Sequence, residues 1–142
     1  MEPTEGKGAP VKLLDTPLLV DFMRRRLEAR QVVETIENAG ERPTTTEVNA
    51  FELAAGTFVD GRVDKVKFAQ LQQTLGRLDV LVLDRAGAYK SAELNSKLRA
   101  AGRGMGALDL LVAGIALASA YDTIVTRDKD FRDIPGLRVE TY

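Results

Sequence analysis

Short apolar runs recur along this chain, and longer stretches with helical spacing separate them. The runs are VKLLD (11–15), DVLVLD (79–84) and DTIVTRD (122–128), and the alternating run LRVETY (137–142) follows them. Continuous runs of this length are typical of strands that are covered on both faces. Strands that alternate with helices form a parallel sheet with helices on either side of it. We therefore predict an α/β fold with three layers, α/β/α, and a mainly parallel central sheet.

The segments between these runs predict helices, because apolar residues recur in them at helical spacing. The expected helices span 16–31, 32–40, 64–78, 88–102 and 107–121, and the Thr-rich segment 42–48 holds a further short strand. Another helix opens at Thr45 or Thr46 with a capping pattern. The inward-facing residues that we expect are Val48, Phe51, Ala55 and Phe58 on that helix, and Val66, Leu71, Leu75 and Leu78 on helix 64–78.

The length of 142 residues suits one domain. We expect residues 1–10 to form a flexible N-terminal tail and residues 11–142 to form the domain. The tail has no apolar core of the kind that a signal peptide needs. The apolar segment 104–121 contains Asp109, and because a charge near the centre of a bilayer is costly, a buried helix is the better interpretation. These features favour a cytoplasmic protein.

Two residue types that serve many enzyme active sites are missing from this sequence. It has no cysteine and no histidine, which excludes disulfides, zinc ribbons, thiol catalysis, Ser-His-Asp catalysis and histidine-ligated metals. A metal site would therefore have oxygen ligands, which suit Mg²⁺, Mn²⁺ or Ca²⁺. The net charge is −1, so the basic excess typical of many DNA-binding domains is absent, although a local basic patch is enough to contact phosphates.

Four acidic residues from distant parts of the sequence are expected at one edge of the sheet. Asp15 ends the first strand, and Asp128 comes at the end of the third apolar run. Asp109 lies in the first turn of the helix that leads into this run, so it faces the same carboxyl edge, where open parallel sheets place their sites. Glu52 projects toward the apolar side of its helix. These four side chains can therefore converge on one location.

Each of these acids also has an ordinary structural explanation. Asp15 could cap the helix that follows it, and Glu52 could be solvated on a helix flank. Asp109 could be favoured by the positive end of its helix, and Asp128 with Asp130 could shape a turn. Their number favours a common site, because clustered carboxylates are costly unless a cation neutralises them. The sequence therefore predicts a site for a divalent ion.

The chemistry of such a site is hydrolysis of a phosphodiester, because a carboxylate-bound ion polarises the phosphate oxygen and lowers the pKa of a bound water. Asp84 also ends an apolar run and is an alternative ligand, but Arg85 follows it and can pair with it. A phosphotransfer domain of the receiver or phosphatase type also has an Asp after its first strand. Such a domain needs a positioned Lys after a late strand, where this chain has Arg127 and an acid.

Five segments share the order and the spacing of their acids with a known family. They are LLDT (13–16), TTTEVNAFELAAG (44–56), ALDLLVAGIAL (107–117), IVTRDKDF (124–131) and GLRVETY (136–142). Together they resemble the PIN domain, and especially the VapC-type toxins of toxin–antitoxin pairs. Each motif is weak alone, whereas the combination is specific. The resemblance extends from about residue 11 to residue 142.

This resemblance implies a metal-dependent ribonuclease that uses Mg²⁺ or Mn²⁺, forms a homodimer and is blocked by a cognate antitoxin. The family's catalytic, metal-binding acids fall on Asp15, Glu52, Asp109 and Asp128. Asp130 matches a further acid that supports the site. Thr126 matches a small hydroxyl residue that can hydrogen-bond a ligand carboxylate or its water. The sequence departs from the family at Pro17, because a polar residue, often Asn, commonly stands two positions after the first acid.

An acidic site that binds RNA needs positive charge nearby. The basic stretches RRRLEAR (24–30) and KLRAAGR (97–103) are candidates, and the residues that we expect to contact RNA are Arg24, Arg25, Arg26 and Arg103. Few aromatic residues are present, so base stacking is not expected to be the main contact. The alternative function is a catalytically silent PIN-like module that binds RNA or a protein. The intact set of acids argues against this alternative.

Overall fold

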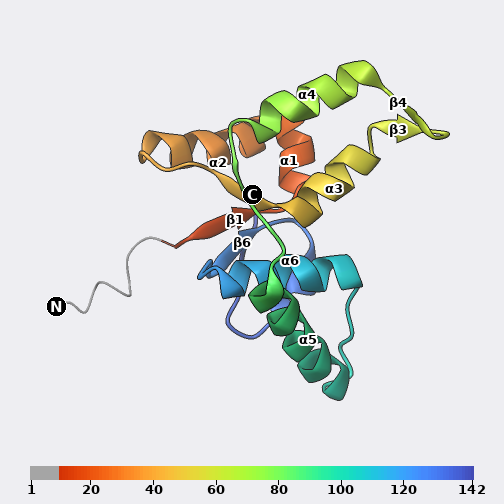
Figure 1. The fold of residues 1–142 in the computed structure, drawn as a ribbon. Helices are drawn as coiled ribbons and strands as arrows, with labels where there is room; N and C mark the ends of the chain where they lie inside the picture. Colours follow the sequence, from red (N-terminus) through yellow and green to blue (C-terminus); the bar gives the residue numbers. More distant parts are fainter. Residues whose placement is uncertain (1–9) are drawn as a thin grey trace.

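The computed structural model of the chain describes residues 10–142 (Figure 1). The predicted tail at 1–10 lies outside the described residues except for Pro10. The elements follow one another in the order β1 (Lys12–Leu14), α1 (Thr16–Met23), α2 (Leu27–Asn38), β2 (Thr44–Thr46), α3 (Glu47–Ala55), β3 (Phe58–Val59), β4 (Arg62–Val63), α4 (Lys65–Leu75), β5 (Asp79–Leu81), α5 (Arg85–Ala100), α6 (Ala107–Ala118), β6 (Thr123–Val125), the short 3-10 helix η2 (Lys129–Asp133) and β7 (Arg138–Glu140).

Parallel strands form the middle layer of the molecule. β6 lies between β1 and β7, and β2 pairs with β5. The Thr45 hydroxyl of β2 donates a hydrogen bond of 2.8 Å to the Leu14 carbonyl of β1, which joins the two groups of strands. Helices α1 to α4 lie on one side of β1 and β6, and α5 and α6 lie on the other (Figure 1). The predicted α/β/α fold with a mainly parallel sheet is confirmed.

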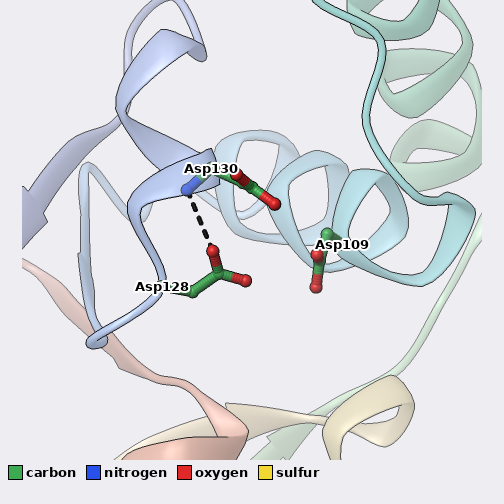
Figure 2. Close-up of side chains that lie close together, drawn as sticks. All are labelled: Asp109, Asp128 and Asp130. Atoms are coloured by element: carbon green, nitrogen blue, oxygen red, sulfur yellow. Dashed lines mark hydrogen bonds between the residues drawn. The ribbon is translucent and has the colours of Figure 1, made fainter.

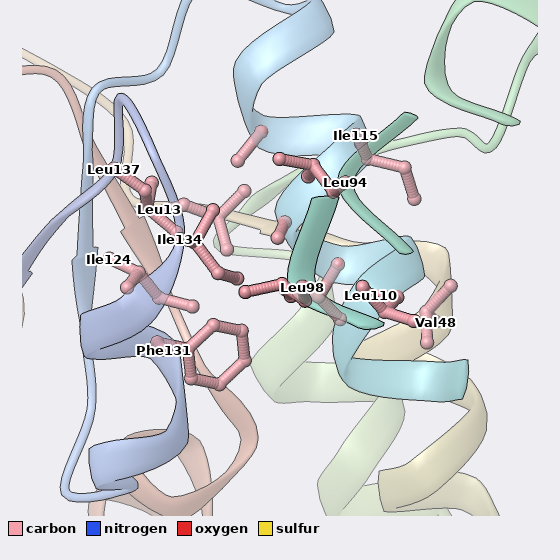
Figure 3. Packing of buried hydrophobic residues seen from close by; sticks show 13 residues of the cluster. Leu13, Val48, Leu94, Leu98, Leu110, Ile115, Ile124, Phe131, Ile134 and Leu137 are labelled. Carbon is pink, nitrogen blue, oxygen red and sulfur yellow. The ribbon is translucent and has the colours of Figure 1, made fainter. Parts of the chain in front are cut away.

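Alternate residues of the central strands point into two separate cores, as the period of a strand requires. Leu13 and Ile124 pack with α5 and α6, together with Phe131 of η2 (Figure 3). Leu14 and Val125 pack on the opposite face with α1, α2 and α4. All five side chains are fully buried. This arrangement explains why the strands are apolar at consecutive positions, because neither face of the sheet is open to water.

The prediction of one helix over 16–31 is wrong, because the chain turns at 24–26. α1 ends at Met23 and α2 begins at Leu27. Between them Arg25 has a φ of 61°, a left-handed conformation that interrupts a helix. Arginine is a good helix former, so the local sequence carries no signal for this turn. It is the packing of α1 and α2 on the same core that sets the break.

Part of the predicted inward-facing set is also wrong. Val48, Leu71 and Leu78 are buried and Leu75 is partly buried, whereas the exposed residues are Phe51, Ala55, Phe58 and Val66. α3 ends at Ala55, and Phe58 belongs to the antiparallel hairpin β3–β4, which the sequence analysis missed. The apolar spacing that predicts a helix through Phe58 therefore runs from the helix into a hairpin. The exposed fractions of Phe51, Phe58 and Val66 are 59%, 49% and 80%.

The apolar segment at 104–121 contains α6, a core helix as predicted, although the helix ends at Ala118. No helix among residues 10–142 is long and apolar enough to cross a membrane. α6 packs closely on α5 at Gly114. A Cβ atom at this position would lie 2.7 Å from the Gly87 carbonyl oxygen and 2.8 Å from the Ser91 amide nitrogen. Only glycine allows the two helices this approach, which fixes the position of α6 and of the residues at its N-terminus.

Candidate active site

The carboxyl edge of the sheet holds the four acids that the sequence analysis selected. Asp15 directly follows β1, Asp128 lies beyond β6, and Asp109 is in the first turn of α6. Glu52 comes from α3. All four line one cleft of about 420 Å³. The structure therefore brings together acids that are separated by as many as 113 positions in the chain, since 128 minus 15 is 113.

Three carboxylates on one side of this site form a tight group. Asp109, Asp128 and Asp130 each offer an oxygen atom, and these atoms lie within 4.8 Å of one another (Figure 2). Asp128 and Asp109 are partly buried, whereas Asp130 is exposed. One oxygen of Asp128 accepts a hydrogen bond of 2.9 Å from the Asp130 amide, so this acid also shapes the turn into η2. Asp128 therefore both shapes this turn and lines the cleft.

Asp15 is the most buried acid of the cleft, with 4% of the residue exposed. The Asn49 side-chain amide donates to one of its oxygens at 3.0 Å, and the Thr126 hydroxyl donates to the other at 2.7 Å. Burial raises the pKa of Asp15, and these hydrogen bonds oppose the rise. The Thr126 hydroxyl also accepts from the Asp128 amide at 3.0 Å. The Thr126 hydroxyl thus links the Asp15 carboxylate to the backbone amide of Asp128.

Asn49 is a site residue that the sequence analysis missed. It is fully buried, and besides Asp15 it donates to the Thr16 hydroxyl at 2.9 Å. That hydroxyl in turn donates to Glu52 at 2.7 Å. Asn49 precedes Glu52 by three positions on α3, and this spacing, which places both on one helix face, is the signal that could have revealed it. Pro17, where the sequence departs from the resemblance, has no side-chain donor, and among the described residues Asn49 and Thr126 are the side chains that donate to Asp15.

We expect Asn49→Ala to lower the free energy of unfolding by about 2 kcal/mol, because Asp15 and Thr16 would lose a buried hydrogen-bond donor. Urea unfolding measures this change. Asn38→Ala, at an exposed position near the end of α2, is the matched control and should change stability by less than about 0.5 kcal/mol. Equal losses in the two variants would contradict the role assigned to Asn49.

The environment of Asp109 is strongly unfavourable for a negative charge. Burial and the neighbouring carboxylates of Asp128, Asp15, Glu52 and Asp130, in that order, raise its pKa to about 6. Carboxylate oxygens are the ligands that Mg²⁺ and Mn²⁺ prefer. A bound divalent cation would remove the repulsion among these groups, so the donor set of the cleft fits such an ion.

The comparison with known families agrees with this geometry. The family described as the PIN domain matches residues 12–137. The chain belongs to the PIN domain family. It is 27% identical over 128 residues to "Ribonuclease VapC19" of Mycobacterium tuberculosis, which covers 90% of this chain and 98% of the relative. It is 28% identical over 74 residues to the "tRNA(fMet)-specific endonuclease VapC" of Shigella flexneri, which covers 52% of this chain and 56% of the relative.

Solved structures share the PIN fold over nearly the whole chain. The DNA-bound VapBC of Salmonella typhimurium aligns with a TM-score of 0.80 at 22% identity, covering 94% of this chain and 98% of that one. VapBC2 of Rickettsia felis, bound to a DNA fragment from its promoter, aligns with a TM-score of 0.79 at 22% identity, covering 92% and 97%. At this level of identity the likeness establishes the fold.

We predict that the stability of this PIN domain depends on pH through Asp109. The folded state holds the Asp109 proton up to about pH 6, whereas the ordinary pKa is 3.8. The folded state therefore binds more protons in this interval, and the wild type loses stability as pH rises through it. Asp109→Asn carries no such proton, so its stability relative to the wild type should increase from about pH 4 and level off above about pH 6.

Urea unfolding of both proteins in chelator, at about pH 4 and about pH 7.5, measures this difference. The other titrating groups are common to the two proteins and largely cancel in the comparison. A stability difference that is the same at both pH values would contradict the raised pKa of Asp109.

The basic residues selected from the sequence lie elsewhere. Arg24, Arg25 and Arg26 occupy the turn between α1 and α2, and Arg103 pairs with Asp133 at 3.1 Å. Within the described part of the chain, none of the four lines the acidic cleft. Their contact with RNA therefore stays a prediction without support from the geometry of the cleft.

Asp84, the alternative ligand, is also outside the cleft. It is the N-cap residue of α5, and its carboxylate accepts from the Gly87 amide at 2.9 Å. β5 accordingly ends at Leu81 and α5 begins at Arg85, earlier than the expected boundaries of 84 and 88. The acid at the end of this apolar run is thus a capping residue.

Proposed function

We propose that this PIN domain protein is a metal-dependent endoribonuclease that hydrolyses RNA phosphodiester bonds, and that it is the toxin of a VapBC-type toxin–antitoxin pair. The observation that carries the proposal is the convergence of Asp15, Glu52, Asp109 and Asp128 in one cleft. The relative from Mycobacterium tuberculosis, which aligns over nearly its full length, is named a ribonuclease. Its name supports RNA as the substrate of this cleft.

In this proposal Asp15, Glu52, Asp109 and Asp128 hold Mg²⁺ or Mn²⁺, and Asp130 supports them. When bound, such an ion polarises a phosphodiester oxygen and lowers the pKa of a water molecule. The chain itself keeps the carboxylates in place: Thr126 and Asn49 orient Asp15, and Thr16 orients Glu52. Carboxylate oxygens that remain free of the ion can orient the attacking water. No covalent nucleophile is needed, in keeping with a chain that has neither cysteine nor histidine.

The proposal includes two protein partners, a cognate antitoxin and a second copy of the chain. The structural relatives from Salmonella typhimurium and Rickettsia felis are VapBC assemblies. Phe51 of α3, Phe58 of the β3–β4 hairpin and Val66 of α4 are exposed apolar side chains, and they offer apolar surface for such a protein contact. We further propose that residues 11–142 form the nuclease domain and that the protein is cytoplasmic.

Cleavage of RNA by the purified protein tests the enzymatic part of this proposal. The assay is run with Mg²⁺, with Mn²⁺ and with chelator, for the wild type and for Asp15→Asn. Asp60→Asn is the matched control, because Asp60 lies in the exposed turn of the β3–β4 hairpin with a φ of 51°, which asparagine tolerates. We expect cleavage that requires both the metal and Asp15 and that is retained in Asp60→Asn.

Calorimetric titration with Mn²⁺ distinguishes the alternative of a silent binding module. Absence of cleavage together with absence of Mn²⁺ binding would overturn the nuclease and favour that module. Metal-independent cleavage that survives Asp15→Asn would also overturn the proposal, because the activity would then come from another site or from a contaminant.

A further inference from the structure

The positively charged side chain of Arg127 lines the acidic cleft, although the basic stretches at 24–30 and 97–103 lie elsewhere. Among the described residues that line the cleft, five are acidic and Arg127 alone is basic. Arg127 lies between Thr126, which holds Asp15, and Asp128, which is itself in the cleft. A polyanion that approaches these carboxylates therefore meets the positive charge of Arg127, which is adjacent in the chain to two residues of the site.

The side chain of Arg127 is held in place by contacts from two other segments. Its Nε donates to the main-chain oxygen of Tyr142 at 3.2 Å, and its guanidinium carbon lies 4.2 Å from the centre of the Tyr142 ring. The Tyr142 hydroxyl donates to Asp21 of α1 at 2.7 Å, which fixes the ring. Tyr142 and Asp21 line the same cleft. The guanidinium thus stacks on a ring that is itself anchored to a helix.

The guanidinium nevertheless keeps capacity to bind an anion. Its side chain is 52% exposed, and its distance to the Asp21 carboxylate is 3.9 Å, too long for a strong ion pair. In the described residues, Nη2 of Arg127 has no hydrogen-bond acceptor. A stacked guanidinium with free N–H groups is a preorganised phosphate ligand, because little side-chain freedom is lost when it binds.

We infer that Arg127 contacts the RNA backbone in this cleft, binding a phosphate beside the bond to be cleaved, and that Tyr142 and Asp21 position its guanidinium. This inference rests on the proposed ribonuclease function. The phosphate contact next to the acids is then Arg127 and not the basic stretches at 24–30 and 97–103. Arg127 touches the substrate, whereas Tyr142 acts through Arg127.

Equilibrium binding of a fluorescent single-stranded RNA tests the contact. The measurements use Asp109→Asn as background, so that the RNA stays intact, and are repeated over a range of salt concentrations. We expect Arg127→Gln to weaken binding about tenfold and to reduce the slope of log affinity against log salt by about 0.7, the value for one phosphate contact on a single strand. Arg127→Lys should restore the slope but only part of the affinity.

The matched control is Arg62→Gln, which removes the same charge from an exposed position on β4 outside the cleft and should leave binding within about twofold. Tyr142 provides a second test of positioning. Tyr142→Leu should weaken binding about threefold because the stacking surface is lost, whereas Tyr142→Phe should retain most of the affinity. In the active protein, Arg127→Gln should raise KM more than it lowers kcat.

The outcomes separate this inference from the function on which it rests. Equal RNA affinity and equal salt slope in the Asp109→Asn background with and without Arg127→Gln would overturn the role of Arg127 and leave the ribonuclease intact. Failure of the background protein and of the wild type to bind or cleave any RNA would overturn both. A loss of binding that is equal in Arg127→Gln and Arg62→Gln would also overturn the inference, because it would reflect net charge alone.

Discussion

Replacing Asp109 by asparagine is expected to reduce metal-dependent RNA cleavage at least about 100-fold while the protein stays folded. Loss of a group that merely supports a metal ligand costs about 10- to 100-fold in metal affinity or activity, and in the proposed function Asp109 is itself a ligand. Its oxygen lies within 4.8 Å of those of Asp128 and Asp130. Asparagine keeps the shape of the side chain and removes the charge that a divalent ion requires.

The fold should survive this substitution, because the charge of Asp109 is itself destabilising without a metal. Its pKa is raised to about 6 by burial and by the surrounding carboxylates. Metal-free Asp109→Asn should therefore be at least as stable as the wild type at neutral pH, and its affinity for Mn²⁺ should fall. Circular dichroism, calorimetry and the cleavage assay measure the three quantities. Full activity in the folded variant would remove Asp109 from the site.

Gly114→Ala is expected to lower the free energy of unfolding by about 3 kcal/mol, at the upper end of the range for overpacked cores. The added methyl group would overlap the Ser91 hydroxyl and lie 2.7 Å from the Gly87 carbonyl oxygen. Rotation of Ser91 relieves the first contact but not the second, since the second involves backbone. α5 and α6 must therefore separate, which disturbs the core shown in Figure 3.

Denaturant unfolding measures this effect, and Gly104→Ala is the control, because a Cβ there would meet no atom within 4 Å. The control should change stability by less than about 1 kcal/mol. Since α6 also carries Asp109, Gly114→Ala should in addition weaken Mn²⁺ binding. If Gly114→Ala is as stable as the Gly104→Ala control, the prediction is wrong, because α5 and α6 can then separate without loss of stability.

The acids of the cleft were found from the sequence because each has a topological reason to be there. Asp15 and Asp128 follow strands that run in one direction, and Asp109 begins the helix that leads back into the second of them. The parallel sheet then brings them to one edge. Glu52 follows from the apolar face of its helix. The metal specificity of this group and its role in cleavage stay predictions until they are measured.

Other site residues could not be obtained this way. The spacing of Asn49 from Glu52 places both on one face of α3, but only the distance of 3.0 Å between the Asn49 amide and Asp15 shows which acid Asn49 holds. Arg127 looks like one more basic residue in a turn, whereas Arg24 to Arg26 form the more conspicuous cluster. The stacking of Arg127 on Tyr142 joins two positions that are close only after β6 and β7 have paired.

The sequence by itself determined the α/β/α layers, the parallel strands and the set of acids, because these depend on periodicity, on chain order and on residue types that are repeated or absent. The tertiary structure alone decided where helix 16–31 breaks, that Phe51 and Phe58 face outward, and which side chains hold Asp15 and Arg127. These features depend on contacts between segments far apart in the chain. Local propensity carries no record of such contacts, since the helix or strand propensity of a residue is the same whichever distant segment packs against it.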